Sequence, residues 1–211
     1  MKSTGMCSCI VVGGVSLSLL LGGCISLPTS STPRFYMLHA PAADQSAGNT
    51  AIASGVVIGV GPVKVPAYLD RPQMVTQDSE KMLYYAQFDR WGESLDIGIE
   101  RLIGEGLTVR LPGEKMALYP WNSSLPVKYQ VAVEIVSLES ELDTDMALVA
   151  QWLVIDSKDA KTLLMKRWEF RQPIIPHTYA GLAATLGTAC ASLSGEIAAS
   201  LTALETQPGT K

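Results

Sequence analysis

The feature that most constrains the fold of this chain lies in its second half, where three strand-like runs are followed by one long helix-like run. The strand-like runs are residues 127–138, 146–155 and 162–173, and short polar turns at 141–145 and 156–161 join them. Short polar connections between such runs predict an antiparallel meander. The middle run is apolar on both faces, which predicts a central strand that is covered on both sides.

The helix-like run from residue 178 to residue 204 carries apolar residues at spacings of three or four. They are Tyr179, Leu182, Leu186, Cys190, Leu193, Ile197, Leu201 and Leu204. This spacing predicts a helix with one continuous apolar face. The other faces consist mainly of small residues, with Glu196 as the single charged residue. Because small side chains let another backbone approach closely, the second face is expected to pack on another helix or another subunit. A plain alanine-rich helix is the alternative.

The first half of the chain contains shorter elements. Residues 34–38, 56–65 and 82–86 read as strands, and a proline-bracketed turn at 66–72 leads into an extended piece that ends at Val75. Leu95, Ile99, Leu102 and Ile103 recur at helical spacing and predict a helix over 92–106, beginning near Glu93 or Ser94 and ending near Gly104 or Gly106. The whole pattern predicts an α+β fold, with a mostly antiparallel sheet of about five to seven strands and two main helices packed on it.

The N-terminus has the organisation of a secretory signal. Lys2 precedes an apolar stretch over residues 10–21. Such a stretch of about 12 residues fits a signal peptide and is too short for a spanning helix, which needs about 20 residues. The stretch ends in Leu21-Gly22-Gly23-Cys24, which resembles the bacterial lipobox. We therefore predict cleavage between Gly23 and Cys24 and a covalent lipid on Cys24. An ordinary secreted protein with an incidental Cys24 is the alternative.

Ile25 follows the predicted lipidated cysteine. An Asp at this place would resemble the signal that retains lipoproteins in the inner membrane, so Ile25 favours the periplasmic face of the outer membrane. Several acyl chains on Cys24 would make the attachment permanent, since one chain alone anchors a protein only marginally.

Removal of residues 1–23 leaves 188 residues, which is enough for one domain of ordinary size. We expect a lipidated cysteine with its Ser/Thr/Pro-rich tether over 24–33, a single periplasmic domain over 34–205, and a flexible tail over 206–211.

The charges and cysteines of this predicted mature chain limit its chemistry. Of the 16 basic and 20 acidic residues, one lysine leaves with the signal, so the net charge is −5. Without a basic run, the chain is not expected to bind nucleic acid. Cys7 and Cys9 also leave with the signal and Cys24 is acylated, so Cys190 remains alone and no disulfide can form within the chain.

The residues that could carry catalysis are scattered. His39 and His177 are far apart in the sequence, and the mature chain has neither a G-x-S-x-G elbow nor a Walker A loop. Asp143 and Asp145 are expected to form a solvated hairpin turn rather than a calcium site. Cys190 falls in the apolar seam and is expected in the core. We therefore predict no enzyme, no metal site and no cofactor apart from the lipid on Cys24.

Several segments resemble one family. They are the lipobox, the strand Phe35-Tyr36-Met37-Leu38, the segment 63–75 with its Pro-x-Tyr-Leu-Asp-Arg-Pro-Gln core, the segment 90–95, and the meander with its closing helix. Together they are similar to the ABC-type transport auxiliary lipoproteins, the group that contains paraquat-inducible protein C. The resemblance covers essentially the whole mature chain.

The resemblance implies a membrane-anchored role in transport between the two membranes. Such a protein would accompany a periplasmic MCE-domain protein and an inner-membrane permease, dock or complete a pathway for lipids or hydrophobic compounds, and could form a homo-oligomer. An outer-membrane assembly lipoprotein that supports a barrel protein is the alternative.

The turn at 66–72 is the predicted contact region. Pro66 and Pro72 fix φ at both ends of the turn, so Tyr68, Leu69 and Arg71 should be held in a set geometry. We hypothesise that these residues, with Trp91 nearby, form a partner-contact edge or a subunit interface. The alternative is that they pack the sheet against the first helix.

Overall fold

The computed structural model describes residues 31–41 and 55–206. Every helix and strand named below lies in the unit Thr32–Lys211. The predicted signal peptide, Gly23, Cys24 and most of the predicted tether and tail lie outside the described residues.

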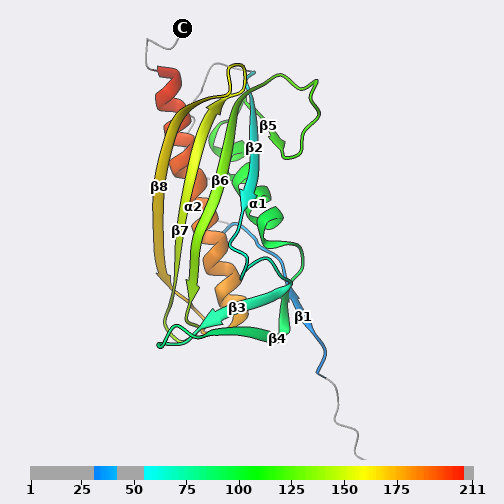
Figure 1. Cartoon of the computed structure of the whole chain (residues 1–211), viewed down its shortest axis with the longest axis vertical. Coiled ribbons are helices and arrows are strands. Elements are labelled where there is room, and N and C mark those ends of the chain that lie inside the picture. Colours follow the sequence, from blue (N-terminus) through cyan, green and yellow to red (C-terminus); the bar gives the residue numbers. More distant parts are fainter. Residues whose placement is uncertain (1–30, 42–54, 207–211) are drawn as a thin grey trace, which may run out of the picture. The chain divides into compact units, whose positions relative to one another are not determined.

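Eight strands and two helices make up the described part of the chain (Figure 1). The strands are β1 (Arg34–Tyr36), β2 (Val57–Lys64), β3 (Gln73–Gln77), β4 (Leu83–Trp91), β5 (Lys115–Leu118), β6 (Val127–Ser140), β7 (Asp145–Asp156) and β8 (Lys161–Pro173), and the helices are α1 (Leu95–Arg110) and α2 (Tyr179–Thr206). The α+β class is therefore confirmed.

The strands form two mixed sheets, where the sequence predicted one mostly antiparallel sheet. The larger sheet has the order β5-β2-β6-β7-β8, and the smaller one has the order β1-β4-β3. The predicted meander is confirmed, because β6, β7 and β8 pair antiparallel. However, β2 runs parallel to both β5 and β6. Parallel neighbours need a long connection, and here the chain passes through the smaller sheet and α1 before it returns beside β2.

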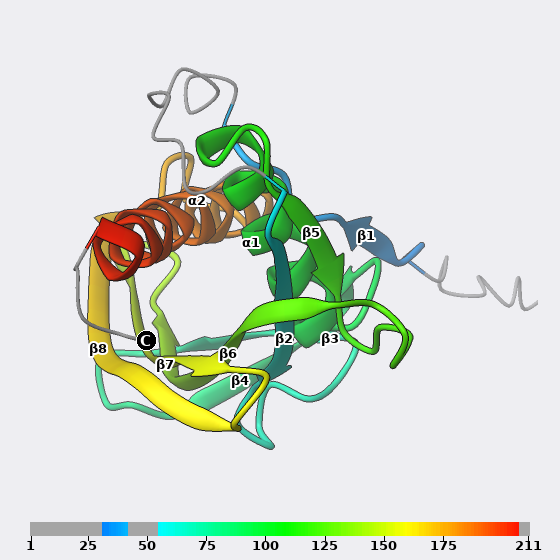
Figure 2. The same ribbon diagram turned by 90° about the horizontal axis from the view of Figure 1, so that it is seen from above.

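Both helices cover one face of the five-stranded sheet, as Figures 1 and 2 show. α1 packs on β2 and β5, and α2 packs on β7 and β8. Every second side chain of β6 and β7 lies between the sheet and the helices and is buried. Val131, Trp152 and Val154 are examples, each with no exposed area. Trp152 is among the largest side chains in this core.

The second face of α2 packs on α1, which confirms one of the two predicted partners for its small residues. A Cβ added at Gly106 of α1 would overlap the Ser194 side chain of α2. In addition, Arg110 of α1 donates to the Ser194 hydroxyl at 3.2 Å. The absence of bulky side chains at this crossing therefore sets how closely the two helices approach.

The predicted end of the first helix was wrong. Ser94 is the N-cap, as expected, but the helix continues past Gly104 and Gly106 to Arg110. These glycines are needed for close approach rather than for termination, since a Cβ at Gly104 would lie 2.6 Å from a methyl carbon of Leu118 in β5. β5 itself was not predicted.

α2 is long and apolar enough, by length and composition, to cross a membrane. Two-thirds (67%) of its most apolar window is buried within the domain. Its contacts with α1 and with β7 and β8 therefore identify it as the central helix of this core.

The outer face of β7 is only half covered among the described residues. Ala147, Val149, Gln151, Leu153 and Ile155 are all partly exposed, whereas their neighbours on the inner face are buried. The prediction that this strand is covered on both sides therefore holds for the helical side alone.

Candidate functional site

The turn between β2 and β3 lies against the end of β4, so the structure brings the predicted contact residues together. Within the turn, the Leu69 amide donates to the Pro66 carbonyl at 2.9 Å, and the Arg71 amide donates to the Leu69 carbonyl at 2.8 Å. The Trp91 amide donates to the Pro72 carbonyl at 2.8 Å. The turn and Trp91 are thus joined by backbone hydrogen bonds.

Tyr68 points from the turn toward the larger sheet. The Tyr68 hydroxyl accepts from the Leu138 amide at 3.0 Å and donates to the Leu138 carbonyl at 3.3 Å. Leu138 follows an irregularity in the β6–β7 pairing between Ile135 and Ser137. Leu69 is buried in the core. Tyr68 therefore ties the turn of the smaller sheet to β6 of the larger one, whereas the sequence offered packing against the first helix as the alternative to a contact surface.

Arg71 and Trp91 border an open hollow of about 350 Å³. The hollow is lined by Asp70, Arg71, Pro72, Trp91, Gly92, Glu93, Ser94 and Leu95. The Arg71 guanidinium lies 4.1 Å from the centre of the Tyr85 ring, a cation–π distance. Its Nε is buried without a hydrogen-bond partner among the described residues. Trp91, which is also part of the lining, is largely buried.

The far rim of the hollow is held by a charged network at the start of α1. Glu93 accepts from Arg101 at 2.6 Å, and Arg101 also donates to Glu105 and to the Leu38 carbonyl, both at 3.0 Å. The hydrogen bond to Glu93 is the main reason that the pKa of Arg101 is raised. This network joins α1 to the segment that follows β1.

β1 is fixed to the opposite side of β4 by one buried carboxylate. Asp89 accepts from Arg34 at 2.9 Å and from the Tyr36 hydroxyl at 2.8 Å, and it is only 5% exposed. Burial, followed by the hydrogen bond to Asp89, raises the pKa of Tyr36. The Gly92 amide also donates to the Tyr36 carbonyl at 2.8 Å. β1 therefore lies directly beside the hollow.

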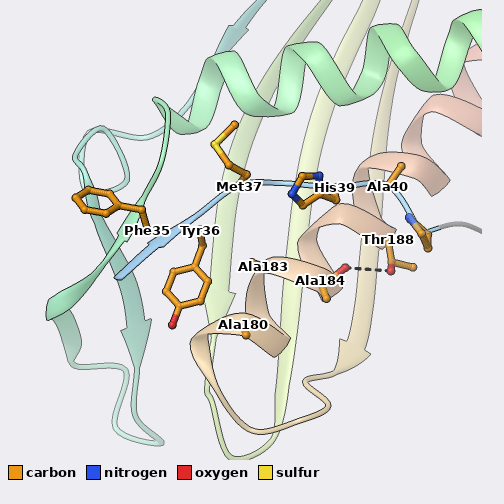
Figure 3. Close-up of a pocket in the computed structure, with 10 residues that line it drawn as sticks. Phe35, Tyr36, Met37, His39, Ala40, Ala180, Ala183, Ala184 and Thr188 are labelled. Carbon is orange, nitrogen blue, oxygen red and sulfur yellow. Dashed lines mark hydrogen bonds between the residues drawn. The ribbon is translucent and has the colours of Figure 1, made fainter. Parts of the chain in front are cut away.

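On its other side, β1 borders a second, more apolar groove of about 470 Å³ (Figure 3). One wall comes from the β1 segment and the other from α2; the lining residues are Phe35, Tyr36, Met37, His39, Ala40, Pro41, Ala180, Ala183, Ala184 and Thr188. Thr188 turns its hydroxyl back to the Ala184 carbonyl at 3.1 Å, so the α2 wall presents mostly methyl groups. Sequence reasoning missed this groove, although the alanines on the second face of α2 were its signal.

The buried ionisable groups of the domain are structural. Burial is the main cause that raises the pKa of Glu100 in α1. Cys190 is confirmed as a core residue with no exposed area, and burial raises the pKa of its thiol to about 12. Such a thiol stays protonated at neutral pH and is not a nucleophile. Within residues 31–41 and 55–206, no three His, Cys, Asp or Glu side chains gather into a metal-binding group.

Comparison with known families identifies the class of protein. The model of a family described as the ABC-type transport auxiliary lipoprotein component matches residues 36–198. This range covers most of the chain, so the chain belongs to that family, and the resemblance inferred from the sequence is confirmed. The family is one of transport auxiliary lipoproteins and not of enzymes.

Solved structures share the fold. The crystal structure of an uncharacterized protein matches with a TM-score of 0.64 at 19% identity, covering 81% of this chain and 99% of that one. A Xanthomonas campestris protein of family DUF330 matches with a TM-score of 0.62 at 12% identity, covering 82% of this chain and 98% of that one. No curated protein sequence matches the chain.

Proposed function

We propose that this chain is the lipid-anchored, outer-membrane component of an intermembrane transport system. It docks a periplasmic MCE-domain protein that works with an inner-membrane permease. In this way it completes a pathway for lipids or hydrophobic compounds. The observation that carries this proposal is the family match over residues 36–198, because that family is auxiliary to ABC-type transport. The lipobox ending at Cys24 supports the anchor, and Ile25 supports the outer membrane.

The hollow beside Arg71 is the surface that we propose for docking. Its rim carries opposite charges on Asp70 and Arg71, and it is held rigidly because Tyr68 fixes the turn to β6 and Arg101 fixes the start of α1. Arg71 lies on the Tyr85 ring with its Nε unpaired within the described part of the chain. Arg71 as a whole is only partly buried, so a carboxylate of a partner can pair with its guanidinium. Rigid rims favour binding because little side-chain freedom is lost.

The test is purification of the tagged, lipidated protein in mild detergent, with identification of the proteins that accompany it. We expect an MCE-domain protein and its permease with the unchanged protein, and loss of both with Arg71→Glu. Arg167→Glu is the matched control, since Arg167 is an exposed arginine on β8 that pairs with a carboxylate, Glu169. The native mass of the purified protein shows whether several copies assemble.

Recovery of a barrel protein in place of the transport proteins would contradict the proposal and favour the assembly role. Equal recovery of the transport proteins with Arg71→Glu and Arg167→Glu would retain the transport role and exclude this hollow as the docking surface.

A further inference from the structure

The hairpin formed by β3 and β4 exposes four consecutive apolar or aromatic residues. Met82, Leu83, Tyr84 and Tyr85 are 57%, 39%, 49% and 45% exposed. Side chains alternate between the two faces of a strand, so a strand that packs on a core with one face would expose only every second residue. The first half of β4 is therefore exposed on both faces. The pairing of β4 with β3 leaves these side chains uncovered, so the sheet itself gives no reason for so much exposed apolar area.

Other exposed apolar side chains lie at the same end of the domain. Ile175, between β8 and α2, is 74% exposed, and Phe35 of β1 is 64% exposed. The hairpin reaches the end of β6 through Lys81, which binds Glu139 at 2.8 Å. The β8–α2 connection reaches the adjoining β6–β7 turn, because the Ile174 amide donates to the Thr144 carbonyl at 3.1 Å. Figure 1 shows β1, β3 and β4 together at this end.

The chain itself indicates what this end faces. Cys24 stands eight residues before Thr32, the first residue of the folded unit. An extended residue spans at most about 3.6 Å, so these residues reach roughly 30 Å. A lipid on Cys24 therefore keeps the end that carries β1 within that distance of a bilayer. Tyrosine suits such a place, since its ring is apolar and its hydroxyl is polar, and it is enriched at membrane interfaces.

We propose that the β3–β4 hairpin rests on the bilayer surface and gives the protein a second, non-covalent contact with the membrane. Met82 and Leu83 enter the headgroup region, and Tyr84 keeps its hydroxyl on Asp78 at 2.8 Å. This contact sets the orientation of the domain, so that the larger sheet and its helices project into the periplasm. The inference rests on the lipid anchor of the proposed function.

The experiment places one spin label on the lipidated protein in vesicles of phosphatidylethanolamine with some phosphatidylglycerol. Met82→Cys carries the label at the hairpin, and Met165→Cys is the matched control, because Met82 and Met165 are both methionines that are 57% exposed. Met165 lies on β8, eight residues before its end at Pro173. Cys190 is buried and takes no label. Each label is also measured in solution on the non-lipidated Cys24→Ser protein made without residues 1–23, so that Cys7 and Cys9 are absent.

We expect the vesicle-bound protein to lose access to a water-soluble nickel chelate severalfold at position 82, with a matching gain in oxygen access, and to keep its access at position 165. Equal access at both positions on vesicles would overturn the inference. So would loss of access at position 82 in the Cys24→Ser protein without vesicles, since a second copy would then cover the hairpin. Failure of the expressed protein to float with vesicles would instead contradict the lipid anchor.

Discussion

The larger sheet and its helices bury their large apolar side chains, whereas the smaller sheet leaves several of its own exposed. In the larger sheet, the side chains of β7 that face the helices are buried, and Trp152 is the largest of them. In the β3–β4 hairpin of the smaller sheet, four consecutive residues from Met82 to Tyr85 are each between 39% and 57% exposed. Both regions are rich in large apolar residues, yet only the first removes them from water.

This difference separates stability from recognition. Buried apolar area contributes roughly 25 cal/mol per Å² to folding, so the inner face of the larger sheet stabilises the domain. Exposed apolar side chains contribute little of this, and a contiguous exposed patch usually marks an interaction surface. The exposed apolar end built from β1, β3 and β4 is therefore where we propose the docking and membrane surfaces, while the helix-covered sheet holds the fold.

Among the variants considered, truncation of Trp152 should lower the free energy of unfolding most. Trp152→Ala should lower the free energy of unfolding by about 3–5 kcal/mol, because it leaves a cavity beneath α2. Met82→Ala in the hairpin should change it by less than about 0.5 kcal/mol. Urea denaturation of both variants measures the two values. A loss of similar size at Met82 would show that the hairpin is part of the stabilising core.

The next largest loss of stability should follow from an added methyl group where the segment after β1 crosses α2. A Cβ at Gly187 would overlap the backbone oxygen of His39, which cannot move like a side chain, so Gly187→Ala should cost about 1–3 kcal/mol. Gly195→Ala on the same helix is the control. A Cβ there comes no nearer than 3.3 Å, to the Arg110 side chain, and alanine favours the helix, so Gly195→Ala should cost much less than Gly187→Ala. Thermal unfolding distinguishes them, and equal losses would contradict a steric cause.

The smallest loss of stability should follow from removal of the hydrogen bonds that join the smaller sheet to the larger one. Tyr68→Phe removes the hydroxyl that accepts from and donates to the Leu138 backbone, which should cost about 1 kcal/mol. Amide hydrogen exchange should show the greatest loss of protection in β3 and β4, because Tyr68 ties their turn to β6. Tyr119→Phe, at a tyrosine that is 51% exposed, should change neither quantity. A uniform loss of protection across both sheets would show that the two regions unfold together.

The elements with long, regular patterns were predictable. The meander from 127 to 173 and the helix after it were read from periodicities that extend over 10 residues or more, and both are confirmed. β5 was not predicted, because four residues carry too little pattern. Gly104 and Gly106 misled the prediction of where α1 ends, because a glycine that permits close packing looks the same in sequence as a glycine that ends a helix.

The candidate site was predictable in part. The turn at 66–72 and Trp91 were grouped because of the family resemblance, and the structure places them beside one hollow. That Tyr68 faces the larger sheet could not be read from the turn, since its direction depends on β6, some 70 residues later. The groove between β1 and α2 was missed for the same reason, because its two walls are about 145 residues apart.

The sequence by itself determined the α+β class, the meander, the small-residue helix α2 and the family, because these depend on spacings between near neighbours in the chain. Tertiary structure alone decided that β2 runs parallel to β5 and β6 and that the strands divide into two sheets. It also decided which large apolar residues stay exposed. The physical reason is that an apolar side chain is equally apolar wherever it stands, and only the elements that pack against it remove it from water.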